Sequence, residues 1–287
     1  MAVQVGDILV SVVVEDAQTR FDALKFFPDA TEQSLAAEFS WMLPELYDPS
    51  LKALKSVVQA YVFKSGGKNV LVDTCVGNEK PGRQKPEWTN ANFPFIENLA
   101  AAGFEPEDID VVLCTHMHLD HAGWNTRLEN GIWVPTFRNA EYLSNDAELA
   151  SLKARGAAGS LVNQLLYQDS VLPVVNSGQL RMVTTDHGVC GGVALEPSPG
   201  HTAGHVSVRI SSGADTAIAT GDMIHHPIQA VHPDWNSSHC ELPDVARKTR
   251  RDFLERVADT RTRILPAHFA PCCAKREGAA FRFLLDS

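Results

Sequence analysis

The stretch THMHLDHAGWN, residues 115–125, places three histidines and one aspartate in six consecutive positions. It follows VVLC, a short apolar run that predicts a β-strand. Where a chain leaves a strand in an extended conformation, side chains two positions apart point the same way, so His116 and His118 can face one point. Asp120 and His121 come as the chain turns and can begin a second group. Neither pair completes a metal site alone, so the stretch predicts a fold in which other segments bring further ligands.

Three later segments offer such ligands, each placed after a predicted strand. His201 lies in the glycine-rich turn SPGHTAGH, Asp222 follows the apolar run TAIAT, and His268 follows RILPA. A single HxH motif is more often a pair of hydrogen-bonded polar residues than a pair of ligands, but four such segments at strand ends are a more specific signal. The sequence therefore predicts a dinuclear metal site. Structural roles are expected for the other histidines considered, His187, His205, His232 and His239.

The motifs HMHLDH, PGHTAGH, TGD and AH resemble, in this order, the metal-ligand motifs of the metallo-β-lactamase superfamily, and the resemblance covers nearly the whole chain. It implies Asp222 as a ligand that bridges two metals. It also implies that Asp73 orients a ligand imidazole through its other nitrogen, although Cys75 stands where the family usually has glycine. The resemblance implies that His116, His118 and His201 bind the first metal, and that Asp120, His121 and His268 bind the second.

The family's fold is α/β, an αβ/βα sandwich of two mixed β-sheets flanked by helices, and residues 1–287 are expected to form one such domain. A helix over 95–102 ending at Gly103 and an amphipathic surface helix over 242–259 agree with it. Residues 21–50 carry aromatics and prolines without a strand period and are expected to form a mobile helical arm or lid. Other expected elements are helices at 139–155, at 160–169 and after RILPA, and strands at 8–14, 57–63, 70–72, 180–184, 193–196, 205–210 and 216–220.

Imidazole and carboxylate ligands without thiolate suit two divalent ions, with Zn²⁺ expected and manganese, iron or cobalt acceptable. Two such ions can share a hydroxide, bring its pKa toward neutrality and polarise a carbonyl or phosphoryl oxygen. The sequence contains no GxSxG motif, so covalent catalysis by a serine is not expected. Hydrolysis by the metal centre is expected, with Asp120 and Asp222 among the catalytic residues.

The substrate class is indicated by two further resemblances. HAGWN is similar to the HAGGN of the acyl-homoserine-lactone lactonases, with Trp124 in place of a glycine, and His225 stands where those lactonases have a tyrosine near the ring oxygen of the substrate. TGDMIHHPIQ is similar to the methyl-parathion-hydrolase branch. These features predict a hydrolase of lactones or carboxylic esters with phosphotriesterase side activity, and His225 as a proton donor. Candidate pocket walls are Phe26, Phe27, Trp41, Trp124 and Trp235.

Two alternative functions would use the same metal ligands. A glyoxalase II-like thioesterase would add basic residues near the C-terminus, where KREG at 275–278 is a weak match. A persulfide-dioxygenase-like oxidoreductase would use one iron and leave the second site empty.

The formal net charge of -10 disfavours a nucleic-acid partner. No apolar run approaches the roughly 20 residues that span a bilayer, and the start lacks the marks of a signal peptide, so a cytoplasmic protein without membrane partners is expected. The six cysteines are scattered and are expected to be free thiols. The expected partner is a small ester or lactone, and the resemblance also implies a possible homodimer.

Overall fold

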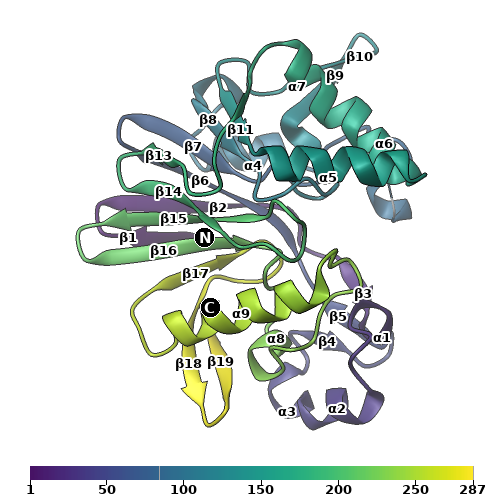
Figure 1. Cartoon of the computed structure of the whole chain (residues 1–287), viewed down its shortest axis with the longest axis vertical. Coiled ribbons are helices and arrows are strands. Elements are labelled where there is room, and N and C mark those ends of the chain that lie inside the picture. The colour runs from purple at the N-terminus through teal and green to yellow at the C-terminus, as the bar shows by residue number, and fades with distance from the viewer. Residues whose placement is uncertain (84, 287) are drawn as a thin grey trace.

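The computed structural model describes residues 1–83 and 85–286. Two seven-stranded sheets pack against each other, with helices on their outer sides (Figure 1). The first sheet is mixed, since its strands are antiparallel from β1 to β7 and parallel from β7 to β12. Its spatial order is β1 (Ala2–Val5), β2 (Ile8–Asp16), β6 (Val58–Ser65), β7 (Lys68–Val72), β8 (Val111–Leu113), β11 (Glu141–Ser144) and β12 (Leu180–Met182).

The second sheet is antiparallel except for one parallel pair, β16 with β17. That pair matters for the site, because the carboxyl ends of parallel neighbours meet at the same edge of a sheet. The spatial order is β13 (Gly188–Cys190), β14 (Val193–Pro197), β15 (Val206–Ser212), β16 (Asp215–Gly221), β17 (Arg263–Pro266), β18 (Cys272–Glu277) and β19 (Ala280–Leu285).

The main core lies between the two sheets. Alternate side chains of the facing strands fill it, among them Val10 and Phe63 from the first sheet and Val208 and Leu265 from the second, all fully buried. Each such side chain contributes roughly 1.5–3 kcal/mol when taken out of water. The sandwich that the resemblance implied is therefore confirmed.

Helices cover the outer face of each sheet. Phe95 and Leu99 of α4 (Phe95–Ala101) pack on the first sheet, and Phe253 and Leu254 of α9 (Pro243–Val257) pack on the second. In Figure 1, α9 runs along β17. Its buried residues recur at helical spacing, and Pro243 at its first turn favours a helix start there. The other α-helices after residue 55 are α5 (Asp146–Ala157), α6 (Leu161–Leu166), α7 (Leu172–Asn176) and α8 (Ile228–Val231).

The segment expected to be a helical arm is helical only in part. Short strands at its two ends, β3 (Arg20–Asp22) and β4 (Tyr47–Asp48), both pair with β5 (Ala53–Lys55) just beyond residue 50, so the expectation of no strand is wrong. The segment is anchored to the chain beyond Asp222, because His226 Nε2 lies 3.1 Å from Leu46 O and His232 Nε2 lies 3.1 Å from Glu38 Oε1. Its helices are α1 (Ala23–Phe26), α2 (Glu32–Ala37) and α3 (Phe39–Met42).

Two other expectations are wrong. The helix expected after β17 is instead the hairpin of β18 and β19, in which Phe281 and Phe283 point inward and alternate with more exposed residues. Gly278, at φ +64°, closes its turn. The helix expected from 139 begins only at Asp146, because β11 precedes it.

A hairpin of β9 (Thr126–Glu129) and β10 (Ile132–Pro135) was not anticipated. No helix in the described part of the chain combines the length and apolar character needed to cross a membrane. The six cysteines lie within that part and are free thiols, as expected.

Candidate metal centre

The predicted ligands gather where several strands end at one edge of the sandwich. Asp222 directly follows β16, and His268 follows its parallel neighbour β17. His116 and His118 follow β8 of the other sheet, and His201 lies in the turn between β14 and β15. A backbone hydrogen bond from Val206 N to Thr115 O, 2.9 Å long, ties the β8 end to β15. Two sheets therefore contribute to one site.

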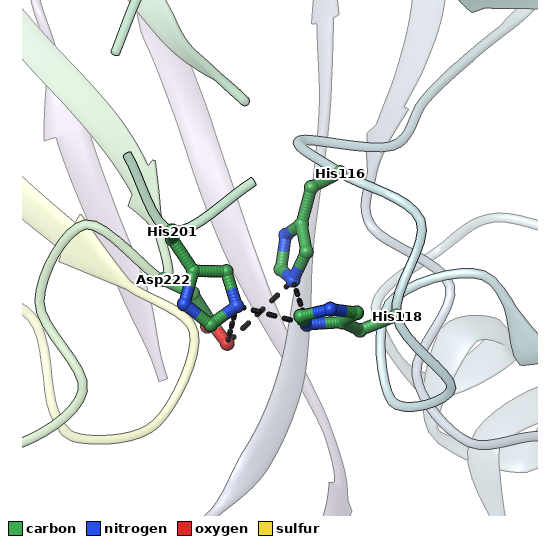
Figure 2. A group of neighbouring side chains, drawn as sticks. All are labelled: His116, His118, His201 and Asp222. Carbon is green, nitrogen blue, oxygen red and sulfur yellow. Dashed lines mark hydrogen bonds and ion pairs between the residues drawn. The ribbon is translucent and has the colours of Figure 1, made fainter. Parts of the chain in front are cut away.

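A first group consists of His116, His118, His201 and Asp222, which face one point (Figure 2). His118 Nδ1 lies 3.0 Å from His116 Nε2 and 2.8 Å from His201 Nε2. Asp222 Oδ2 lies 3.3 Å from His201 Nε2 and 3.6 Å from His116 Nε2. Three imidazole nitrogens that converge in this way cannot all carry protons, so they offer lone pairs to a cation.

A second group consists of Asp120, His121 and His268. The other oxygen of Asp222, Oδ1, lies 3.1 Å from His121 Nε2 and 2.9 Å from His268 Nε2. Asp120 lies farther out, with its oxygens 3.9 Å from His121 Nε2 and 3.7 Å from His268 Nε2. Asp222 thus presents one carboxylate oxygen to each group.

These residues fit two divalent cations. Although His121 Nε2 and Asp222 Oδ1 lie 3.1 Å apart, neither makes a hydrogen bond within the described residues, and leaving both buried in this way is costly unless something else binds them. The donors are imidazoles and carboxylates, a set that suits zinc and also accepts manganese, iron or cobalt. The seven residues named from the sequence as ligands all lie in these two groups.

The two groups differ in their protonation. Burial lowers the pKa of His116, His118 and His201 well below its ordinary value, so these rings are neutral. Burial also acts on His121 and His268, but the negative charges of Asp222 and Asp120, joined by Asp73 at His121, together outweigh it and raise the pKa of both rings. A cation that binds the second group must therefore displace protons.

Asp73 lies behind the second group, as the sequence predicted. Its Oδ2 is 3.0 Å from His121 Nδ1, the nitrogen that faces away from Asp222, and its Oδ1 accepts a hydrogen bond from Thr115 N at 2.7 Å. Asp73 and Cys75 have φ values of +62° and +49°, a region in which residues other than glycine are uncommon. The chain therefore makes this turn with cysteine at the position where glycine was expected.

A cavity of about 270 Å³ opens onto both groups. Its apolar wall includes Phe21, Phe26 and Trp88, and its polar wall includes Lys85 and Arg155. Of the five aromatic residues proposed as pocket walls, only Phe26 lines it. Phe27 and Trp235 pack in the core of the arm, Trp124 stacks on Phe95, and Trp41 lies beside Arg282.

Residues 55–268 match the family model described as the metallo-beta-lactamase superfamily. The chain belongs to this superfamily. Over 167 residues this superfamily member is 28% identical to an N-acyl homoserine lactonase from a Bacillus species, a match that covers 54% of the chain and 58% of the relative. The chain thus spans less than two thirds of the length of that relative.

Two solved structures are similar to the superfamily member over its whole length. AidC, a dizinc quorum-quenching lactonase solved with a product, has a TM-score of 0.79 at 22% identity and covers 100% of this chain and 97% of its own. The hydrolase AbOPH has a TM-score of 0.83 at 18% identity, with the same coverage. At these sequence identities, the structural similarity supports the fold of the chain and nothing about its substrate.

His225 of this superfamily member, predicted to be a proton donor, lies in the wall of the cavity. Its Nε2 is 3.2 Å from Asp222 Oδ2 and 3.3 Å from Ser237 Oγ, and its ring meets the ring of Phe26 edge-on at 5.3 Å. Burial lowers its pKa, so the ring is neutral in the absence of a metal. Its Nδ1 has no hydrogen-bond partner among residues 1–83 and 85–286.

His205, which was expected to be only structural, contacts the site from behind. Its Nε2 accepts a hydrogen bond from Asp222 N at 3.1 Å, so its Nδ1 carries the proton and donates to Ser198 Oγ at 2.8 Å. Burial lowers the pKa of His205 to about 3 and keeps it neutral. A Cβ on Gly221 would lie 2.8 Å from His205 Nε2, so the glycine of TGD permits this contact.

Proposed function

We propose that the protein is a dinuclear metal-dependent hydrolase that opens lactones or cleaves carboxylic esters. The proposal rests on one observation, that Asp222 presents one oxygen to each of two histidine groups at the base of a cavity. In this proposal Asp222 bridges the ions, with Zn²⁺ as the expected metal. The first ion is held by His116, His118 and His201, and the second by Asp120, His121 and His268.

The ions, when bound, supply a nucleophilic hydroxide at neutral pH and positive charge for the carbonyl oxygen. The protein supplies the positions of these groups. Asp120, a member of the second group, also lines the cavity, and in this proposal its carboxylate orients the attacking water. His225 lines the cavity with its Nε2 3.2 Å from Asp222 Oδ2, and in this proposal it donates a proton to the alkoxide that leaves when a lactone ring opens.

The cavity supports a substrate with a small apolar acyl group. Phe21, Phe26 and Trp88 give it an apolar wall, and a volume of about 270 Å³ suits a compact substrate. The first two of these residues belong to the segment 20–27, so the N-terminal arm forms part of the pocket within a single domain. The similarity to N-acyl homoserine lactonases supports the choice of a lactone.

A hydrolysis screen of the metal-loaded protein tests the proposed substrate class. The substrates are a series of lactones, nitrophenyl esters, a phosphotriester and a glutathione thioester, ranked by kcat/KM. We expect lactones or carboxylic esters to rank first, and the phosphotriester to be a slower substrate of the same centre. A glutathione thioester in first place would contradict the proposal and favour the thioesterase alternative. No hydrolysis of any of them, with oxygen uptake on a persulfide, would favour the oxidoreductase.

A further inference from the structure

A row of polar residues on one face of α5 points toward the metal centre. Asn145, Glu148, Ser151 and Arg155 are spaced by three or four positions, so they lie on the same side of the helix. Glu148 is 2% exposed and Asn145 is 5% exposed. A buried carboxylate is retained only where it is hydrogen-bonded, so the partners of Glu148 define its role.

Glu148 joins the two loops that carry the histidines of the first group. Its Oε1 accepts a hydrogen bond from Met117 N at 2.7 Å, and Met117 stands between His116 and His118. Its Oε2 accepts a hydrogen bond from Thr202 Oγ1 at 2.6 Å, and Thr202 directly follows His201. One side chain therefore fixes the distance between these two loops.

The neighbours of Glu148 on α5 hold the same loops. Asn145 accepts a hydrogen bond from Glu148 N at 3.0 Å and donates one to Gly204 O at 2.8 Å. A Cβ on Gly204 would lie 2.3 Å from Glu148 N, so glycine allows this close approach. Ser151 donates to Glu241 Oε2 at 2.7 Å, and the same oxygen accepts from Ala203 N at 3.1 Å.

The second group is held by other parts of the fold. His121 Nδ1 lies 3.0 Å from Asp73 Oδ2, beyond the end of β7, and His268 Nδ1 lies 2.9 Å from Val57 O, before β6. In residues 1–83 and 85–286, no hydrogen bond joins α5 to Asp120, His121 or His268. Asp73 Oδ1 also accepts a hydrogen bond from Thr115 N at 2.7 Å, and Thr115 Oγ1 lies 3.2 Å from His116 Nδ1, so Asp73 supports both groups, whereas the hydrogen bonds of Glu148 reach only the first.

We propose that Glu148 is a positioning residue for the first metal site, through which that site can be weakened without emptying the second. The inference rests on the proposed dinuclear function. Loss of the Glu148 carboxylate leaves Met117 N–H and Thr202 O–H without acceptors, so the two loops are held less closely and the three imidazoles converge less well. Asp73 orients His121 of the second group and, through Thr115, also supports the first.

Glu148→Ala and Asp73→Ala test this separation by metal titration. We expect Glu148→Ala to bind the ion of the second group as tightly as the wild type and the ion of the first group about 10–100-fold more weakly, as is typical when a group that orients a ligand is lost. Asp73→Ala should weaken both ions, because Asp73 contacts His121 and the Thr115 segment. Anomalous scattering at the zinc edge locates the retained ion, which should lie in the second group in Glu148→Ala.

Two further variants control the experiment. Glu148→Gln keeps an acceptor for Met117 N and should recover part of the lost affinity, even if Glu148→Ala fails to fold. Asp146→Ala removes an exposed carboxylate two positions earlier, in the same first turn of α5, and should bind both ions normally. Wild-type affinity for both ions in Glu148→Ala and Glu148→Gln, or equal weakening of both ions, would overturn the inference. Fewer than two ions in the wild type would instead contradict the proposed function.

Discussion

Replacing Asp222 with alanine is expected to lower kcat/KM by more than about 10⁴-fold, the order of loss seen when one member of a catalytic unit is removed. Its Oδ2 lies 3.3 Å from His201 Nε2 and its Oδ1 lies 2.9 Å from His268 Nε2, so both metal groups lose a ligand at once. The variant should also bind fewer ions than the wild type. Steady-state kinetics and elemental analysis of the same samples measure both effects.

His187 provides the control, since it does not line the cavity. His187→Ala should retain metal content and rate. A variant Asp222→Ala that keeps both ions and hydrolyses the best substrate at the wild-type rate would show that this carboxylate does not bridge the site.

Replacing His225 with phenylalanine is expected to slow lactone hydrolysis by a factor of about 10² to 10⁴, the range for loss of a general acid. An alkoxide is a poor leaving group and benefits from a proton, whereas a nitrophenolate leaves without one. Hydrolysis of nitrophenyl esters should therefore be barely affected. The measurement is kcat/KM for both substrates at constant metal content.

His239→Phe is a matched control, because His239 also lines the cavity and has its ring 5.8 Å from the ring of Phe26. It should slow both substrates to a similar, small extent. Equal losses on both substrates in His225→Phe would indicate that His225 only positions the substrate. An unchanged lactone rate would remove it from the reaction.

The sequence predicted most of the fold because its strands are short apolar runs separated by glycine-rich turns. The C-terminal hairpin was missed because a run such as AFRFLL can be a buried helix or a strand, and periodicity alone does not decide between them. The turn at Gly278 was the available signal. β11 was missed because its four residues lead into α5 through Asn145, which caps that helix.

The metal ligands could be predicted from the sequence, whereas most of the pocket walls could not. Each ligand stands beside a strand end, so local sequence determines where it lies. The pocket walls depend on how the N-terminal arm packs, and Phe21 and Trp88 line the cavity although no motif marks them. Glu148 gave no signal, since its partners Met117 and Thr202 are 31 and 54 positions away.

The metal content of the purified protein tests the central claim most directly. Elemental analysis after reconstitution with zinc, manganese or iron should give two ions per chain, because two complete groups share Asp222. Removal of the ions by a chelator should abolish lactone hydrolysis, and their return should restore it. A saturated stoichiometry of one ion, or full activity in the metal-free protein, would contradict the dinuclear mechanism.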